Sequence, residues 1–326
     1  MIDPSRGDLC EPLRLAIDRG RRQLGLPGVS PALWEWRLRH PAGAHLAAWR
    51  DAAGELRAAL MGLAHPARLA GEPVRFLECL ELFQAREAGR EMTRTTPLGE
   101  LCKAFASQVG GRAPEAIPVI YGWPTRRAHR YLLSQEKAEV LRSEERLRAD
   151  QKMLEQWSQA QAGGLELEPI ERFPAAMDAF FERFSDGREA LLVRDAERLN
   201  WRFVEHPERD YACVLVRRAE EVLGYAVLRM GEGGVAHLVE CIALDVGRDA
   251  IEALLGWAAR WSLEKGASSL VFGISTWSPE YRFFQALGFR VEDCEEYMLF
   301  RSFQKPFIMS WLFHGWFYSA GDLERG

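Results

Sequence analysis

Lysine, metal-binding cysteine pairs and nucleotide-binding loops are scarce or missing in this sequence. Only 5 of its 42 basic residues are lysine. This arginine bias is typical of a GC-rich genome, so arginine clusters carry little functional weight. No two cysteines have CxxC spacing, and neither a P-loop nor a GxSxG elbow occurs. We therefore expect no bound metal. We expect the six cysteines to be free thiols, mostly buried: Cys10, Cys79, Cys102, Cys213, Cys241 and Cys294.

Long apolar runs and an excess of positive charge are also missing. No apolar run reaches the roughly 20 residues that a membrane-spanning helix needs, and the first residues show no apolar signal segment. The net charge of −5 argues against a nucleic-acid partner, because such proteins usually carry a basic stripe. We expect a cytoplasmic protein with no membrane span and no nucleic-acid partner.

What the sequence does contain is an internal repeat. LECLEL at 77–82 resembles VECIAL at 239–244, and other matches precede each stretch in the same order and at nearly the same offset. Such ordered matches indicate duplication, and 326 residues suffice for two domains. The other matched positions, first copy against second, are Trp36-Arg37 with Trp201-Arg202 and His40-Pro41 with His206-Pro207.

The periodicity predicts an α/β fold, an α+β mixed sheet in each of two tandem domains, mostly antiparallel and with helices on both faces. Between the copies, Val140, Leu147 and Leu154 recur every seven residues, which favours a connecting helix. A strand at 138–143 that closes the first sheet is the alternative. Residues 289–303 are predicted to form a final hairpin. The predicted ranges are 1–133 for the N-terminal domain, 134–163 for a helical linker, 164–303 for the C-terminal domain and 304–326 for an aromatic tail.

Particular residues resemble the GNAT (GCN5-related N-acetyltransferase) superfamily, here as a tandem pair. They are FGISTWSPEYRFFQALGF at 272–289 and YGWPTRRAHRYL at 121–132. The resemblance implies that the fourth and fifth strands of a domain splay apart and that the pantetheine of an acyl-CoA pairs with the exposed strand edge. It also implies that the pyrophosphate lies at the following helix N-terminus, where unpaired N–H groups favour an anion.

The first copy matches these implied positions better than the second. Its loop at 84–96 contains several arginines and ends in Thr96-Pro97, a good start for a helix. The corresponding stretch of the second copy, 244–254, is short and has Asp245 and Asp249 around one arginine. One departure is Glu91, which stands where the family has a small residue. The residues implied for acetyl-CoA, or another acyl-CoA, are Leu82, Phe83, Arg90, Arg94, Thr95, Thr96 and Arg126.

Direct acyl transfer to an amine needs a proton acceptor and benefits from a donor for the leaving thiolate. The resemblance places a carboxylate on the fourth strand, where Glu78 and Glu81 lie, and a tyrosine on a later helix, where Tyr131 lies. Strict alternation along a strand would put Glu78 and Glu81 on opposite faces. In the second copy Ala243 matches Glu81 and Phe284 stands at the tyrosine position, so we expect that copy to be catalytically weak.

We therefore expect an acyl-CoA-dependent N-acyltransferase, most simply acetyl-CoA-dependent, that acts on a small-molecule or peptide amine. One alternative is a catalytically inactive acyl-CoA-binding or protein-interaction module. Another is an aminoacyl- or peptidyl-transferase that uses charged tRNA, against which the acidic composition argues. The tail at 310–324 is either a lid over the acceptor site or a hydrophobic strap, and we favour the strap.

Overall fold

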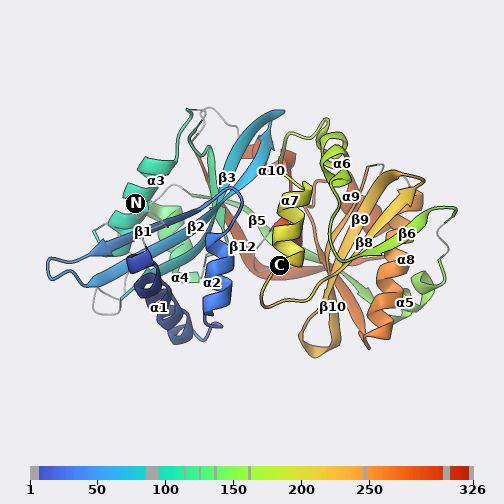
Figure 1. Cartoon of the computed structure of the whole chain (residues 1–326), viewed down its shortest axis with the longest axis horizontal. Helices are drawn as coiled ribbons and strands as arrows, with labels where there is room; N and C mark the ends of the chain where they lie inside the picture. The colour runs from blue at the N-terminus through green and yellow to red at the C-terminus, as the bar shows by residue number, and fades with distance from the viewer. Residues whose placement is uncertain are drawn as a thin grey trace. The chain divides into compact units, whose positions relative to one another are not determined.

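The computed structural model describes residues 7–85, 95–113, 115–124, 126–135, 138–160, 163–244, 248–303 and 309–322. The chain divides into two compact units (Figure 1). The first unit comprises residues 1–67, 73–143 and 296–309, and the second comprises residues 68–72, 144–295 and 310–326.

The first unit combines helices at its N-terminal side with a mixed sheet. Its helices are α1 (Gly7–Gln23), α2 (Pro31–Leu38), α3 (Pro97–Val109) and α4 (Arg126–Gln135). Its strands are β1 (Ala44–Arg50), β2 (Leu56–Leu69), β3 (Glu72–Gln84), β4 (Val119–Gly122), the first residues of β5 (Glu139–Asp150) and the last residues of β12 (Arg290–Ser302).

The second unit contains most of the remaining elements. Its helices are α5 (Gln151–Ser158), α6 (Ala176–Ser185), α7 (Ala196–Leu199), η2 (Asn200–Val204), η3 (Glu232–Gly234), α8 (Arg248–Glu264), α9 (Pro279–Ala286), α10 (Met309–Gly315) and η4 (Ala320–Asp322). Its strands, besides the rest of β5 and β12, are β6 (Glu166–Ile170), β7 (Ala190–Leu192), β8 (Ala212–Arg218), β9 (Glu221–Met230), β10 (Val235–Ala243), β11 (Ser269–Gly273) and β13 (Trp316–Phe317).

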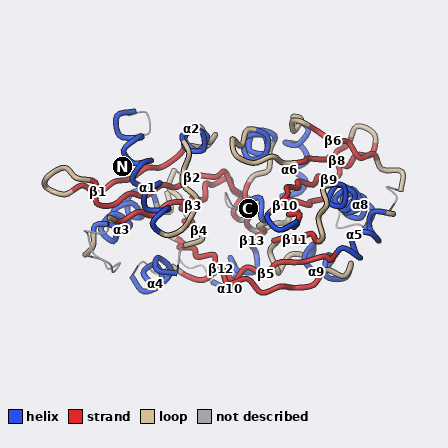
Figure 2. Tube along the Cα trace, turned by 90° about the horizontal axis from the view of Figure 1, so that it is seen from below, coloured by secondary structure: helices blue, strands red, loops and turns tan. Residues whose placement is uncertain are grey.

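The two units share one sheet pattern (Figure 2). In the first, antiparallel β1 and β2 lead to β3, which is parallel to β4, and β4 is antiparallel to β12. In the second, antiparallel β6, β8, β9 and β10 lead to a parallel β10–β11 pair, and β11 is antiparallel to β5. The expected mixed, mostly antiparallel α/β fold in two domains is therefore confirmed.

Matched positions of the repeat form the same local structure. Ser30 caps α2 by accepting from the N–H of Leu33, and Asp195 caps α7 by accepting from the N–H of Arg198. After each helix a histidine Nδ1 accepts from the backbone N–H two residues on: His40 from Ala42 at 3.1 Å and His206 from Glu208 at 3.2 Å. These turns precede β1 in the first unit and β8 in the second.

Two predictions about the segments that join the units were wrong. Residues 139–150 form β5, not a helix, because Leu147 and Ala149 are buried at alternate positions and Leu154 belongs to the separate helix α5. This agrees with the strand alternative. Residues 290–302 form one strand rather than a hairpin, and they contain no glycine, proline or asparagine to make a tight turn.

These strands also change the unit boundaries. The predicted first domain ended at residue 133, yet residues up to 143 and residues 296–309 belong to the first unit. The predicted second domain, 164–303, loses residues 296–303 and gains residues 144–163. The strand β5 begins in the first unit and ends in the second, where it pairs with β11. The strand β12 begins in the second unit and ends in the first, where it pairs with β4.

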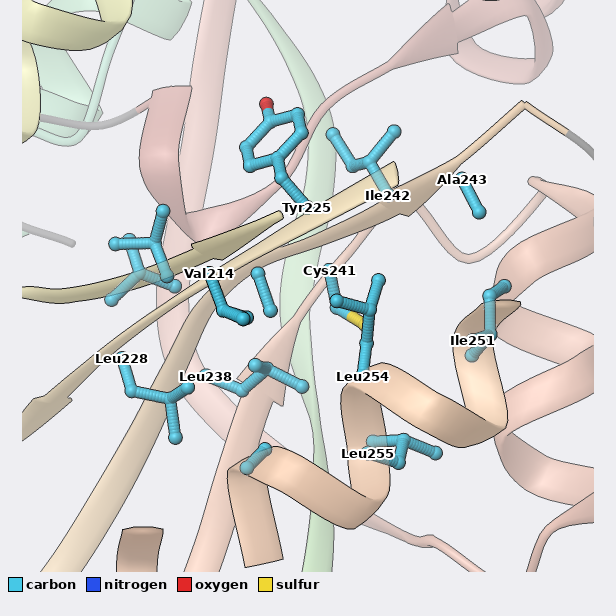
Figure 3. Close-up of a cluster of buried hydrophobic side chains, with 14 of the residues drawn as sticks. Val214, Tyr225, Leu228, Leu238, Cys241, Ile242, Ala243, Ile251, Leu254 and Leu255 are labelled. Carbon is cyan, nitrogen blue, oxygen red and sulfur yellow. The ribbon is translucent and has the colours of Figure 1, made fainter. Parts of the chain in front are cut away.

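The core of the second unit lies between its sheet and α8. Leu228, Leu238 and Cys241 are on the side of Leu254, whereas Tyr225 and Ile242 are on the opposite side (Figure 3). Helices α5 and α8 lie side by side on this face (Figures 1 and 2). In the first unit, the corresponding cluster joins β1–β3 to α3: Ala47, Leu60, Leu77, Leu101 and Phe105 are among its buried members.

Candidate functional site

The strands β3 and β4 of the first unit separate halfway along β3. They pair from Phe76 with Val119 to Glu78 with Tyr121. One position further on, Gly122 lies so close to β3 that a Cβ there would be 2.7 Å from the carbonyl oxygen of Cys79. The strand β4 ends at Gly122, but β3 continues to Gln84. Strand pairing therefore stops near residue 79, and residues 80–84 of β3 extend beyond the end of β4.

The two candidate acids lie on the same face of β3, so strict alternation fails here. Cys79 and Leu82, three positions apart, both pack against the cluster that contains α3. Glu81 instead contacts Arg37 of α2, and Glu78 contacts His65 of β2, which in turn contacts His40 just after α2. An irregularity between Cys79 and Leu82 explains this, just as a register shift between Leu238 and Glu240 interrupts β10.

Glu81 is held by two arginines. Its Oε1 accepts from Arg21 Nη1 at 2.6 Å and from Arg37 Nη1 at 3.1 Å. Arg37 and Glu81 are buried, so the pair is shielded from solvent. Any proton accepted by Glu81 would have to compete with two guanidinium ions at the same oxygen. The contacts therefore indicate a structural ion pair that joins α1 and α2 to β3.

Glu78 lies at the end of a buried chain of histidines. Its Oε2 is 3.1 Å from His65 Nε2, and His65 Nδ1 is 3.0 Å from His40 Nε2. His40 Nδ1 accepts from the N–H of Ala42. All three side chains are at most 4% exposed. Because Glu78 is also the last β3 residue paired with β4, this chain ends where the strands begin to diverge.

The thiol beside these acids is not a nucleophile at neutral pH. Burial, together with the nearby carboxylates of Glu81 and Glu78, raises the pKa of Cys79 to about 12. A thiol must ionise to attack. Cys79 is therefore disfavoured as a nucleophile.

The N-terminus of α3 has the expected form, but its donors are already used by the protein. Thr96 is the N-cap and accepts from the N–H of Gly99 at 3.3 Å, and Pro97 has no N–H to offer. The N–H of Leu98 donates to Gln84 Oε1 at 3.3 Å. A phosphate oxygen at this helix end would take the place of the Gln84 side chain at Leu98.

The other predicted residues fall into four groups. Tyr131 is buried and donates to the carbonyl oxygen of Gly99 at 3.2 Å, so its hydroxyl lies against the first turn of α3. Phe83 packs on Gly20 of α1, and Leu82 packs towards α3. Thr95 precedes the α3 cap. Arg90 and Arg94 lie outside the described residues, and the Arg126 side chain is likewise not described.

The corresponding strands of the second unit also separate, but the tail fills the opening. The strands β10 and β11 pair only from Val235 with Ser269 to Leu238 with Phe272. Beyond that point Ser319 forms an antiparallel bridge with Ile274, and the N–H of Ser275 donates to the carbonyl oxygen of Tyr318 at 2.8 Å. The tail therefore pairs with the residues that directly follow β11.

A buried charge cluster fixes this tail. Asp322 accepts from Arg194 and, at 3.0 Å, from Arg198 Nη2. Glu240, the counterpart of Glu78, lies 3.6 Å from Arg194 Nε and is so close to Gly321 that a side chain there would collide with its carboxylate. Burial raises the pKa of Glu240, and Arg194 opposes that effect. The tail is thus part of the core of the second unit, in agreement with a strap rather than a lid.

Sequence reasoning missed two functional features. His65 lies in ALMGLAH, a stretch whose only visible signal is apolar, and its contact with His40 depends on how α2 packs on β2. The contact between the tail and the β10–β11 region was also missed. The possible indication in the sequence was a set of opposite charges, Asp322 in the tail and the arginines Arg194 and Arg198. Within the described residues, no helix is long and apolar enough to cross a membrane, and no acidic, histidine or cysteine cluster is arranged to hold a metal.

Comparison with solved structures identifies this fold. A protein of Enterococcus faecalis described as a probable N-acyltransferase matches 90% of this chain and 70% of its own, with a TM-score of 0.67 at 13% identity. A GCN5-related N-acetyltransferase of Kribbella flavida matches 92% of this chain and 69% of its own, with a TM-score of 0.62 at 14% identity.

A third solved structure matches this chain with a lower TM-score. Saccharomyces cerevisiae N-myristoyltransferase with bound myristoyl-CoA matches 92% of this chain and 80% of its own, with a TM-score of 0.55 at 12% identity. No family model matches the sequence, and no curated protein sequence does either. At these identities the similarity establishes the fold alone: the chain has the GNAT fold over most of its length.

Proposed function

We propose that this chain, built on the GNAT fold, is an acyl-CoA-dependent N-acyltransferase whose working site is the β3–β4 opening of the first unit. The observation that carries the proposal is the contrast between the two openings. The β3 edge at residues 80–84 extends beyond β4, whereas the matching opening of the second unit contains the protein's own tail. An internal duplication followed by loss of the second site accounts for both.

In the proposed reaction, Glu78 accepts a proton from the ammonium of the acceptor. The neutral nitrogen then attacks the thioester carbonyl carbon, a C–N bond forms, and the C–S bond breaks as the tetrahedral intermediate collapses. The nitrogen loses its second proton to water, the CoA thiolate takes a proton from Tyr131, its candidate donor, and the resulting tyrosinate regains a proton from water. Glu78 is favoured over Glu81 because two arginines already engage Glu81.

Acyl-CoA would be held along residues 80–84 of β3, with its pyrophosphate at the N-terminus of α3. Thr95 and Thr96 stand at that end, and Arg90, Arg94 and Arg126 supply positive charge from the neighbouring sequence. Acetyl-CoA is the simplest donor. Myristoyl-CoA bound to the yeast neighbour shows that a related fold accepts a long chain, so chain length is best tested directly. The acceptor is a small-molecule or peptide amine, and we propose a cytoplasmic location.

The test combines calorimetry and turnover. Titration with acetyl-CoA and with longer acyl-CoAs should show binding, and release of free thiol should be detected with at least one member of a panel of amines. Binding without turnover across the panel would favour the non-catalytic acyl-CoA-binding alternative. Absence of binding to every acyl-CoA would refute both proposals and leave the fold without this activity.

A further inference from the structure

The histidine chain behind Glu78 has a fixed direction. The N–H of Ala42 donates to His40 Nδ1, so that nitrogen carries no proton. A neutral His40 must then carry its proton on Nε2, which faces His65 Nδ1 at 3.0 Å. His65 Nδ1 is therefore an acceptor, and its own proton lies on Nε2, 3.1 Å from Glu78 Oε2. One backbone amide thus sets both tautomers.

The direction of these bonds disfavours an additional proton on either histidine and on Glu78 Oε2, so the proton that Glu78 accepts from the amine is assigned to its other oxygen, Oε1. A proton added to Nδ1 of His40 would face the Ala42 N–H, and one added to Nδ1 of His65 would face the Nε2–H of His40. A proton on Glu78 Oε2 would face the Nε2–H of His65. Each addition replaces an acceptor by a donor that faces another donor, so each costs a buried hydrogen bond.

We propose that His65 and His40 are positioning residues that hold Glu78 as an ionised, oriented proton acceptor at the point where β3 and β4 diverge. This inference rests on the proposed function, since Glu78 is taken to receive the proton of the amine. The histidines pass no proton to the substrate. They supply Glu78 with a hydrogen-bond donor that stays in one place, and they lose that arrangement when either ring is protonated.

The second unit lacks this arrangement. His206 keeps the turn of His40, with its Nδ1 accepting from Glu208. The residue opposite Glu240 on β9, however, is Val227, and Glu240 is paired with Arg194 instead. The histidine chain is therefore a property of the first unit and not of the repeated fold, which points to a role in the site and not only in stability.

The groups that can influence the chain come from each element packed around it. The strand β3 supplies Glu78 and, further along the same face, Glu81 with its partner Arg37 from α2. The strand β4 supplies Tyr121, whose ring centre is 6.4 Å from that of His65. Glu78, His40 and Tyr121 are thus the titratable side chains for which a contact with the His65 ring is established.

Substitutions of His65 separate positioning from packing. His65→Gln keeps one acceptor and one donor, whereas His65→Leu keeps the volume and removes both. We expect His65→Leu to lower kcat about tenfold or more with little change in the KM for acyl-CoA, and His65→Gln to recover most of that loss. Because an amide does not titrate between pH 5 and 8, His65→Gln should also shift the acid limb of the kcat/KM profile.

His206→Gln, in the second unit, is the matched control and should leave kcat and the pH profile unchanged. The overturning result is a His65→Leu variant that folds, binds acyl-CoA and keeps the kcat and the pH profile of the wild type. Failure of the wild type to bind or turn over acyl-CoA would instead refute the proposed function.

A second measurement does not depend on activity. In protein with ¹⁵N-labelled histidine rings, NMR of the wild type and of the His40→Gln and His65→Gln variants assigns the ring signals. Both wild-type rings should be neutral Nε2–H tautomers near pH 7, and the variants should lose the corresponding signals. A proton on Nδ1 of either ring would overturn the positioning chain even if the enzyme proves active.

Discussion

The two splayed strand pairs differ in what lies at their opening. In the first unit β3 runs beyond β4 after Cys79, and no described segment bridges residues 80–84 on the β4 side. In the second unit β10 runs beyond β11 after Leu238, and Ser319 of the tail bridges to Ile274. The end of β3 thus extends beyond its partner strand without a described bridge, whereas the matching region of the second unit is bridged by the tail.

The matched glutamates of the two units, Glu78 and Glu240, also have different partners. Glu78 faces the imidazole of His65, whereas Glu240 faces the guanidinium of Arg194 and shares it with Asp322. With the tautomers proposed above, Glu78 lies beside a neutral donor and can still accept a proton from a substrate. Glu240, by contrast, lies in a cluster with two arginines and Asp322, and this cluster holds the tail. Sequence identity at the glutamate therefore does not imply an identical role.

The largest expected effect comes from releasing the tail. Asp322→Ala leaves Arg194 and Arg198 buried without their shared carboxylate, which should lower the free energy of unfolding by about 3–5 kcal/mol. Urea denaturation measures this, with the exposed Glu171→Ala as control. A loss below about 1 kcal/mol would show that the tail is dispensable and would weaken the contrast between the openings.

The next effect concerns the two matched glutamates. Glu78→Gln should lower kcat about 100-fold while the Kd for acetyl-CoA stays nearly constant, because a general base is lost without loss of the CoA contacts. Glu81→Gln should reduce kcat less, through its ion pair with Arg37. Glu240→Gln, in the second unit, should leave kcat within about twofold. Equal losses in Glu78→Gln and Glu240→Gln would mean that the units are not functionally distinct.

A smaller effect is expected at the phosphate end of the proposed cleft. Arg94→Glu reverses a charge just before the α3 cap and should weaken acetyl-CoA binding about tenfold. Arg248→Glu, in the corresponding stretch of the second unit, should not change the Kd. Calorimetry compares the two variants, and the reverse ranking would move the acyl-CoA site to the second unit.

The smallest effect is a pH dependence of stability that belongs to the second unit. Burial, with Arg229 and Arg146 nearby, lowers the pKa of His237 to about 4. Between about pH 4 and 6.5 the unfolded chain therefore binds more protons, and stability falls as the pH falls through this window. Because His237 is half-buried, His237→Gln should recover only about 1 kcal/mol at pH 4.5. An unchanged acid slope in chemical denaturation would contradict this.

Much of the fold could be predicted because local signals were strong. Ser30, Thr96 and Ser278 precede proline at helix starts, and each caps its helix as such a pair predicts. The repeated Trp-Arg and His-Pro pairs located the two units. Residues 139–150 misled because a seven-residue spacing of apolar side chains does not distinguish a helix from a strand followed by a helix.

The site could be predicted only in part, because its decisive contacts join distant segments. Glu78 was found from its strand, but its partner His65 lies on another strand and gives no signal within an apolar run. The opposite-face expectation for Glu78 and Glu81 failed because one irregularity in β3 changes the alternation, and nothing in the sequence marks such a position. The pairing of Asp322 with Arg194 spans 128 residues.

A crystal structure with bound CoA tests the central claim most directly. Electron density for the pantetheine along residues 80–84 of β3, with the pyrophosphate at the N-terminus of α3 in place of the Gln84 side chain, is the predicted result. Density between β10 and β11, with the tail from Trp316 to Asp322 displaced, would contradict the account.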